Sequence, residues 1–323
     1  MRTNRSVRRR TYPNGGIRAA HESTERDNFI INKNRILGVL LIIVSAASFG
    51  TLAIFGRYAY ADGLDIFTLL FLRFTLASIL IAGLLILRHE ELPRGKELYQ
   101  LVGMGAIGYV GQSFSYLAAI QFASVGLVAL LLYLYPVFVA VLATIFFKEK
   151  FTRVKIIALV LATLGAAMTA NPQGGEWAGI LLALSAAAIY SVYIIVGTGV
   201  MQKVSAVCSS TVIFASAGVV YGALMAINRP HWPGSSNGWL AAAAIALIAT
   251  VIPVVTFLAG LKLVGPTEAS MLSTLEPVVT VLLAAGLLGE RLTPIIYLGG
   301  GFILAAVILL TRTEFVIRDT VRQ

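Results

Sequence analysis

The sequence predicts an all-α integral membrane protein with ten transmembrane helices, arranged as two inverted five-helix repeats. Three observations support this fold class. Of the 323 residues, 58% are hydrophobic and only 12% are charged, whereas soluble proteins are about 45–50% apolar and about 25% charged. The apolar residues gather in ten separate blocks. The two halves of the chain also contain the same short motifs at a constant offset.

Each apolar block is close to the ~20 residues that a helix needs to cross ~30 Å of hydrocarbon. The blocks lack the alternation of barrel strands, so helices are the expected spanning elements. In chain order, the blocks are Leu37–Gly56, Ile66–Leu87, Leu101–Ile120, Val125–Phe147, Val154–Ala170, Trp177–Gly197, Ser210–Ile227, Leu240–Leu261, Ala269–Gly289 and Ile295–Thr311.

The internal repeat relates residues 36–170 to residues 177–312. In each half, a proline is followed after twelve residues by an acid–base pair: Pro136 precedes Glu149-Lys150, and Pro277 precedes Glu290-Arg291. The two copies are offset by 141 residues. Each half contains five blocks, an odd number, so the halves cross the membrane in opposite orientations. Inverted repeats are typical of secondary transporters, because they provide two nearly equivalent ways of packing one half against the other.

The distribution of basic residues predicts the orientation of the helices. Residues 1–35 are a basic tail without an apolar block, which we expect to be disordered. Beyond this tail, lysine and arginine lie mostly in alternate loops. Cytoplasmic loops carry the excess of positive charge, so both termini, including a second tail at residues 313–323, are expected to be cytoplasmic. The chain is therefore predicted to be a multi-pass protein of the cell membrane.

Several other classes of site are not expected. The single cysteine, Cys208, rules out an internal disulfide, and three scattered histidines argue against a metal site. Gly95-Lys96 is followed by Glu97, so the phosphate-binding loop of ATP-using proteins is missing and no cofactor is expected. The net charge of +10 is explained by the tail and the alternate loops, so nucleic acid is not an expected partner. The expected partners are a small-molecule substrate and the lipid bilayer, and the oligomeric state is left open.

Four features together resemble EamA-type members of the drug/metabolite transporter superfamily: the repeated proline-to-glutamate spacing, Leu72-Arg73-Phe74, Leu275-Glu276-Pro277 and Gly289-Glu290-Arg291-Leu292. The resemblance covers about residues 36–312. It implies a ten-helix carrier with a central cavity, moving small metabolites such as amino acids, often outward. The first repeat departs from the pattern, with Tyr135-Pro136 where the second has Glu276-Pro277. A role for a carboxylate before the proline therefore transfers only to the second half.

Glu276 and Arg73 are the charged residues expected near the middle of the membrane. A carboxyl group there must be neutralised, paired or hydrated, so Glu276 is a candidate for substrate binding or ion coupling; the alternative is a structural carboxylate that bonds across helices. Arg73 could hold a carboxylate or phosphate of a substrate through its planar fork, or it could pair with Glu276. We favour the pair, because nothing else in the predicted hydrocarbon region offers either residue an opposite charge.

Other polar and aromatic residues could line a cavity between the spans. Tyr109, Gln112, Ser113 and Tyr116 follow i, i+3, i+4, i+7 spacing and share one helix face. Further candidates are Tyr135, Tyr190, Tyr193, Thr250 and Thr256. The alternative for this set is helix packing or anchoring at the membrane interface. Proline weakens a helix locally, so hinges are expected at Pro136, Pro253 and Pro277.

The resulting hypothesis is a secondary active transporter, an exporter, that works by alternating access around a central cavity; a proton is one candidate for the coupling ion. A membrane enzyme would need clustered nucleophiles, acid–base pairs or metal ligands at one membrane face. The blocks contain almost no aspartate, glutamate or histidine beyond Glu276, so the chain is not expected to be an enzyme. A receptor or scaffold is a further alternative, but it does not require an inverted repeat.

Reporter fusions test the predicted topology. A fusion after Asn171 should report an external location, and fusions after Lys203 or at Gln323 a cytoplasmic one, because basic loops are retained inside. Paired alkaline phosphatase and fluorescent protein fusions make the measurement. A cytoplasmic signal at Asn171 would contradict the five-plus-five inverted arrangement.

Overall fold

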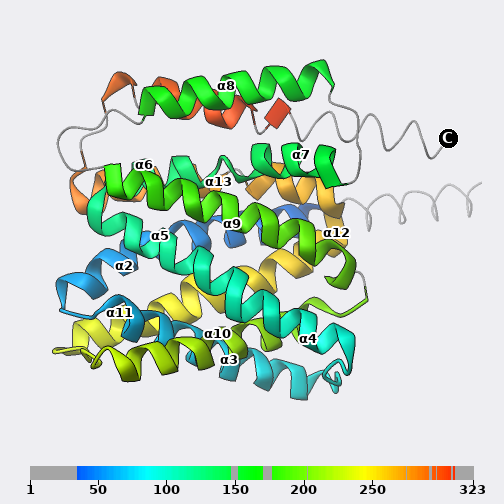
Figure 1. Ribbon diagram of the computed structural model, residues 1–323, viewed down its shortest axis with the longest axis vertical. Coiled ribbons are helices and arrows are strands. Elements are labelled where there is room, and N and C mark those ends of the chain that lie inside the picture. Colours follow the sequence, from blue (N-terminus) through cyan, green and yellow to red (C-terminus); the bar gives the residue numbers. More distant parts are fainter. Residues whose placement is uncertain are drawn as a thin grey trace, which may run out of the picture.

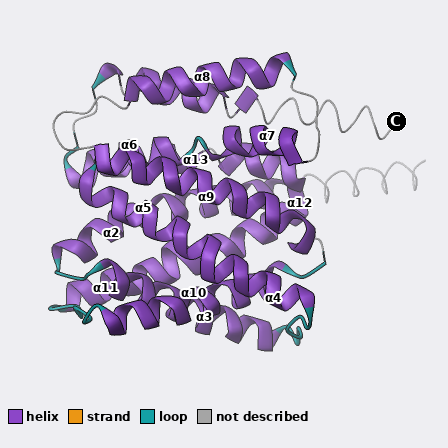
Figure 2. Cartoon of the chain, in the orientation of Figure 1, coloured by secondary structure: helices purple, strands orange, loops and turns teal. Residues whose placement is uncertain are grey.

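The computed structural model describes residues 35–146, 152–169, 177–201, 203–273, 275–290, 293–295, 297–306 and 308–309. Within these ranges every regular element is a helix (Figure 2). The long axes of the helices run roughly parallel to one another, in a stack with α8 at one end and α3 and α10 at the other (Figure 1). This is the arrangement that a bundle of membrane-spanning helices requires.

In the first half, a helix from residue 35 leads into α2 (Leu52–Ala61). It is followed by α3 (Ile66–Leu87), α4 (Lys96–Gly103), the π-helical turn η1 (Met104–Tyr109), α5 (Val110–Phe122), α6 (Val125–Leu132), α7 (Tyr135–Phe146) and α8 (Arg153–Thr169). The second half contains α9 (Trp177–Met201), α10 (Ala206–Ile227), α11 (Ser236–Ala246), the π-helical turn η2 (Leu247–Val251), α12 (Ile252–Ser273), α13 (Leu275–Leu288) and a helix over Tyr297–Ala306.

Within the described part of the chain, five helices are long and apolar enough to cross a membrane: Arg35–Ala61, Ile66–Leu87, Trp177–Gly197, Ala206–Ile227 and Ser236–Leu261. Shorter apolar helices lie at Val125–Val139, Ile156–Gly165, Leu275–Leu288 and Tyr297–Ala306. Large apolar side chains such as Ile79, Leu87 and Val219 are exposed on the outside of the bundle, as lipid contact requires. The chain is a multi-pass membrane protein, while the count of ten spans stays a prediction.

Serine and aspartate side chains mark where several helices begin. Asp65 caps α3 by accepting hydrogen bonds from Phe67 N–H and Thr68 N–H. Ser124, Ser205 and Ser235 cap α6, α10 and α11 in the same way. These residues satisfy N–H groups that the first turn of a helix leaves without a partner.

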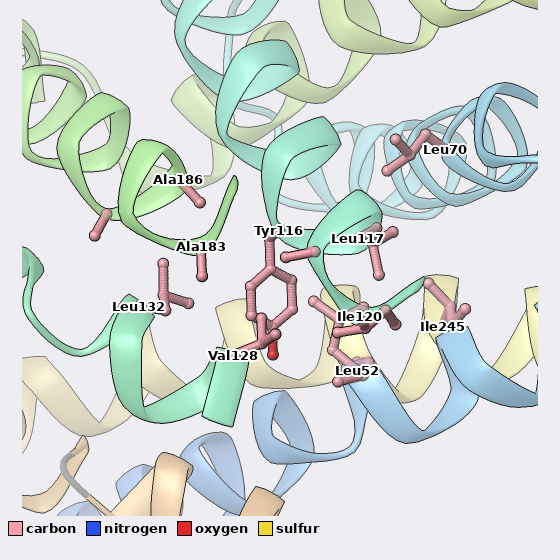
Figure 3. Close-up of a cluster of buried hydrophobic side chains, with 14 of the residues drawn as sticks. Leu52, Leu70, Tyr116, Leu117, Ile120, Val128, Leu132, Ala183, Ala186 and Ile245 are labelled. Carbon is pink, nitrogen blue, oxygen red and sulfur yellow. The ribbon is translucent and has the colours of Figure 1, made fainter. Parts of the chain in front are cut away.

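The core forms where the two halves pack together. α10 lies along α3, with the ring of Tyr221 stacked on that of Phe74 at a centroid distance of 5.6 Å. η1 approaches α10 so closely that a Cβ atom on Gly105 would overlap the carbonyl oxygen of Ile213. Figure 3 shows a second part of the core, in which the ring of Tyr116 lies among Leu132, Leu52 and neighbouring apolar residues. Both halves therefore contribute to one continuous interior.

The irregular points of the helices repeat with the same offset as the sequence motifs. The offset of 141 residues places Tyr109, the last residue of η1, opposite Thr250 in η2. The same offset relates Pro136, which follows the turn at Tyr133 and Leu134 between α6 and α7, to Pro277 in α13. Two π-helical turns and two prolines at equivalent positions indicate that the halves share one architecture.

Proline explains where the helix of the first half breaks. A proline has no N–H, so it cannot donate to the carbonyl four residues earlier. Pro136 withholds this bond from Leu132, the last residue of α6. Residues 125–147, expected as one span, are therefore interrupted by the turn at Tyr133 and Leu134. In the second half, Thr274, between α12 and α13, lies outside the described residues.

One expected boundary differs. The sequence predicts a connection between the blocks Leu240–Leu261 and Ala269–Gly289, but α12 continues as helix to Ser273. The side chains of residues 264–271 lie outside the described part of the chain.

Two acids in the loop between α2 and α3 bind the loop between α10 and α11. Asp62 accepts hydrogen bonds from the hydroxyl and the N–H of Ser235, and these lower the pKa of Asp62. Asp65 accepts from His231 N–H at 2.9 Å. Partial burial raises the pKa of Asp65, but its hydrogen bonds outweigh this and hold the pKa below the usual value. The two halves are thus joined by hydrogen bonds at this end of the bundle.

Glu290, part of the repeated acid–base pair, contacts the other half of the chain. Its two oxygens accept hydrogen bonds from Val125 N–H at 2.7 Å and Gly126 N–H at 3.1 Å, at the start of α6. A carboxylate at a helix N-terminus satisfies free N–H groups and offsets the helix dipole. Its repeat counterpart, Glu149, lies outside the described residues.

The Glu290→Gln variant should destabilise the fold by about 1–2 kcal/mol, because the amide keeps one acceptor oxygen and loses both the second bond and the negative charge. Thermal melts in detergent measure this loss. Glu91→Gln is the matched control, since Glu91 pairs only across an exposed surface with Arg94 at 3.8 Å and such pairs contribute little. Equal melting temperatures for Glu290→Gln and Glu91→Gln would show that Glu290 does not hold α6.

Candidate functional site

A cavity of about 100 Å³ lies between the two halves. The side chains that reach it come from the helix before α2, from α2, α3, η1, α5, α6, α7, α9 and α13, and from the turn after α6. Its lining consists of Phe49, Leu52, Arg73, Tyr109, Gln112, Tyr116, Leu132, Tyr133, Tyr135, Tyr190 and Glu276. The cavity therefore combines two opposite charges with five tyrosine rings.

Seven of the residues selected from the sequence meet in this cavity: Arg73, Tyr109, Gln112, Tyr116, Tyr135, Tyr190 and Glu276. They come from five helices and one π-helical turn that are widely separated along the chain. The structure thus brings together the two charged candidates and most of the aromatic ones. Their functional roles stay predictions.

Glu276 belongs to α13. Its Oε2 accepts a hydrogen bond from the Tyr133 hydroxyl at 2.9 Å. The same hydroxyl lies 2.8 Å from the carbonyl oxygen of Ser273. Tyr133, from the other half, therefore bridges the carboxyl group of Glu276 and the backbone of Ser273.

Arg73 is 3% exposed and is positioned by the π-helical turn η2. Its Nε donates to Thr250 Oγ1 at 3.1 Å, and Thr250 Oγ1 in turn donates to the carbonyl of Ile245 at 2.9 Å. The guanidinium carbon also lies 4.9 Å from the ring centroid of Phe74. A π-helical turn adds a residue to the helix and redirects a side chain, which is why such turns recur at functional sites.

The pairing of Arg73 with Glu276 that the sequence analysis favoured does not occur in this conformation. Both side chains line the cavity, but no ion pair joins them among the interactions of the described residues, where a pair requires N···O within 4.0 Å. Each residue is held by a hydroxyl group instead, Arg73 by Thr250 and Glu276 by Tyr133. The cavity thus presents two opposite charges that do not neutralise each other directly.

Tyrosine rings form a continuous wall beside the charges. The ring of Tyr135 lies edge-on to those of Tyr133 at 5.7 Å and Tyr190 at 4.8 Å. Tyr193 stacks on Tyr190 at 5.8 Å and contacts Tyr109 at 5.7 Å. These centroid distances are within the range of favourable aromatic contacts. Tyr193 supports the wall from behind and does not line the cavity itself.

Three other candidates also lie outside the lining. Ser113 donates to the carbonyl of Tyr109 and shares a hydrogen bond with the Tyr221 hydroxyl. Thr250 does not line the cavity, but it accepts the hydrogen bond from Arg73 described above and so helps to position Arg73. Thr256 donates to the carbonyl of Ile252 in its own helix at 2.8 Å. Such a bond satisfies the threonine hydroxyl without any role in a cavity.

The three candidate hinge prolines occupy different places. Pro277 is buried in the first turn of α13, and Pro253 lies in the first turn of α12, directly after η2. Ser45 donates to the carbonyl of Pro253 at 2.8 Å. Pro136 belongs to α7, and its side chain lies outside the described part of the structure. Whether these positions move stays a prediction.

The sequence analysis missed Phe49, Leu52, Leu132 and Tyr133. The first three are apolar residues of apolar spans, and nothing in the sequence distinguishes them from residues that face lipid. Tyr133 did carry a signal, because it lies three residues before Pro136 in an otherwise apolar run. A tyrosine hydroxyl inside a span needs a partner, so it could have been selected with Tyr135.

A larger cleft of about 600 Å³ lies between α2 and α11, but we do not take it as the site. Its polar lining is limited to Tyr58, Asp62 and Asn237. Asp62 is already engaged by Ser235. The smaller cavity holds the convergent charged groups that binding sites require. Among the described residues, no group of three or more His, Cys, Asp or Glu side chains is arranged to hold a metal ion.

The chain is similar to several membrane transporters. A protein of Archaeoglobus fulgidus named as an uncharacterized transporter is 28% identical, over 85% of this chain and 96% of that protein. The uncharacterized inner membrane transporter YedA of Escherichia coli K12 is 26% identical, over 75% of this chain and 80% of YedA. The uncharacterized transporter YcbK of Bacillus subtilis is 24% identical, over 82% and 89%.

A solved crystal structure supports the fold. It matches 87% of this chain and 98% of its own with a TM-score of 0.64, at 19% sequence identity. The sequence model of the EamA-like transporter family matches the chain twice, over residues 36–171 and 177–312. These two matches coincide with the repeats that the motifs and the π-helical turns define. The chain therefore belongs to the EamA-like transporter family.

Proposed function

We propose that this protein is a secondary active transporter that exports small zwitterionic metabolites, such as amino acids, by alternating access, with protons as the coupling ion. One observation carries the proposal: Arg73 and Glu276 line one small cavity between the repeats without pairing with each other. Buried charges are costly, so an uncompensated pair of opposite charges within a membrane protein indicates a site for a charged ligand.

The cavity has a suitable partner for each part of an amino acid. The guanidinium of Arg73 can bind a carboxylate, and the carboxylate of Glu276 can bind an ammonium group. The tyrosine wall offers apolar faces to a side chain and attracts cations through its rings. At about 100 Å³, the cavity is well below the roughly 300–1,000 Å³ of sites for drug-sized ligands. A small substrate fits this conformation best.

Alternating access follows from the inverted repeats. The helix that is broken between α6 and α7 reaches the cavity, and a break allows the two parts of a helix to move with respect to each other. Glu290 holds the start of α6 against the second half at one end of the bundle. In the proposed topology this end is external and both termini are cytoplasmic, so release of this contact would open the cavity outward.

In this proposal the chain is a carrier and not an enzyme or a receptor. Reconstitution in proteoliposomes tests it: vesicles loaded with a panel of unlabelled amino acids should take up the matching radiolabelled amino acid by exchange. A growth screen with amino acid analogues in overexpressing cells selects the panel. Protein that folds and reconstitutes but exchanges no member of the panel would contradict the proposed substrate class.

The Arg73→Met variant should lose binding of the substrate. It should also melt at a higher temperature, because its free energy of unfolding should rise by about 1–3 kcal/mol. Methionine fills the space of the arginine and removes a buried charge that has no ion-pair partner. Arg57→Met is the control, since Arg57 donates to the carbonyl of Ala123 at 2.8 Å and its loss should only destabilise. If Arg73 instead forms an essential ion pair, Arg73→Met would lower stability by about 3–5 kcal/mol.

The Glu276→Gln variant should fold and insert but lose proton-driven transport by about tenfold or more, because glutamine keeps the volume and the hydrogen bond while removing titration. Exchange of substrate without a proton gradient should fall by a smaller factor than proton-driven transport does. Flux driven by a pH gradient in proteoliposomes measures the difference, with Glu91→Gln as the control. Normal pH-driven flux in Glu276→Gln would show that Glu276 does not couple transport to protons.

A further inference from the structure

The cleft between α2 and α11 has a polar end and a mostly apolar wall. Its volume is about 600 Å³, and it shares no lining residue with the cavity that holds Arg73 and Glu276. Asp62 and Asn237 lie at the polar end, where α2 ends and α11 begins. The rest of the lining consists of Phe55, Tyr58, Ala61, Leu240, Ala241, Ala244 and Ile248. A cleft with this distribution suits an amphipathic molecule.

The length of the cleft matches one leaflet of a bilayer. Its lining runs along α11 and η2 from Asn237 to Ile248, a spacing of 11 residues, or about 16 Å at 1.5 Å per residue. Half of a hydrocarbon core of ~30 Å is about 15 Å. Near the polar end, the rings of Trp232 and Trp239 stack, and both are half-exposed. Such rings lie at the level of the lipid headgroups, so the cleft extends from that level towards the middle of the membrane.

The cleft opens on the outer surface of the bundle. α2 and α11 pack side by side (Figure 1), and the lining residues Tyr58, Leu240 and Ile248 are exposed. Ala241 is buried beneath them, and its small side chain leaves the space unfilled. Exposed apolar side chains of a membrane helix face lipid. The molecule that meets this cleft within the bilayer is therefore a lipid.

The polar end carries a negative charge without a cationic partner. Asp62 accepts hydrogen bonds from the hydroxyl and the N–H of Ser235 and from neighbouring backbone groups, which hold its pKa below the usual value. These donors are neutral, so the charge of the ionised carboxylate is not cancelled. Among the ion pairs of the described residues, none involves Asp62, whereas Asp65 lies 3.8 Å from His231. Charge complementarity therefore favours a headgroup with an ammonium group.

We propose that the cleft between α2 and α11 binds one membrane phospholipid with a primary ammonium headgroup, such as phosphatidylethanolamine. The ammonium group contacts the carboxylate of Asp62, and one acyl chain follows the apolar lining to Ile248. An anionic headgroup is disfavoured, because Asp62 and the nearby Asp65 repel it. This lipid site is separate from the transport cavity and does not rest on the proposed transport of amino acids.

Competition between two lipids tests the site. The protein is stripped of lipid in detergent and mixed with equal amounts of phosphatidylethanolamine and phosphatidylglycerol that carry the same acyl chains. Native mass spectrometry then counts the lipids that each chain retains. One phosphatidylethanolamine should be retained per chain, in preference to phosphatidylglycerol by at least about fivefold, because one ion pair at a partly exposed position contributes about this factor.

Two variants separate the headgroup contact from the acyl-chain contact. Asp62→Asn keeps the shape and removes the charge, so the two lipids should bind about equally. Glu91→Gln, which removes an acid at an exposed surface elsewhere, should keep the preference. Ala244→Trp fills the cleft and should retain at least about fivefold less of either lipid. Its matched control is Ala243→Trp, since Ala243 is exposed on the same helix and does not line the cleft.

Each outcome supports or overturns the lipid site. Equal binding of the two lipids by the unchanged protein, or a preference that persists in Asp62→Asn, would overturn the role of Asp62. Retention that is as high in Ala244→Trp as in Ala243→Trp would show that the lipid binds elsewhere. Should Asp62→Asn fail to fold, the preference of the unchanged protein and the two tryptophan variants decide. No step measures transport, so failure of the lipid site leaves the proposed function standing, and the reverse holds too.

Discussion

The missing N–H of a proline inside a membrane helix is the constraint on which this structure depends. In hydrocarbon there is no water to replace a lost backbone hydrogen bond, so each freed carbonyl must find a donor within the protein. Pro136 and Pro277 create such positions at equivalent places in the two halves, and the helix of the first half breaks there, at Tyr133 and Leu134. Tyr133, from this turn, donates to the carbonyl oxygen of Ser273 in the second half at 2.8 Å. The turn beside Pro136 therefore joins the two repeats at the cavity.

The two repeats share one helical architecture, and the residues that differ between them include the charged residues of the cavity. At the offset of 141 residues, Glu276 corresponds to Tyr135, Arg73 to Phe214, and Thr250 to Tyr109. A purely structural interface between inverted repeats would gain nothing from such differences. In each case the polar or charged member reaches the cavity or supports a residue that does. A substrate is asymmetric, so a substrate site between two similar repeats requires residues that differ between them.

The long helices could be predicted from the sequence because each is a continuous apolar segment. For example, α3 has the same bounds as its predicted block, Ile66–Leu87. The repeat, and the gathering of Arg73 and Glu276 in one cavity, also follow from the sequence. The irregular turns do not, since η1 and η2 arise from packing that no local pattern records. The same holds for the partners of the charges. Electrostatics alone favours an ion pair, but Thr250 and Tyr133 lie closer once the turns have redirected the side chains.

The same reasoning explains how a cavity with two uncompensated charges can serve transport. The attraction between opposite charges is several times stronger in a protein interior than in water, and so is the cost of leaving a charge alone. Closing this cavity while it is empty therefore isolates Arg73 and Glu276 from water and from each other. A zwitterion neutralises both charges, whereas a proton neutralises Glu276 alone. If movement between the two packings requires a closed cavity, the empty and ionised carrier moves least readily. Coupling of substrate movement to proton movement then follows from the free-energy cost of burying the charges of Arg73 and Glu276.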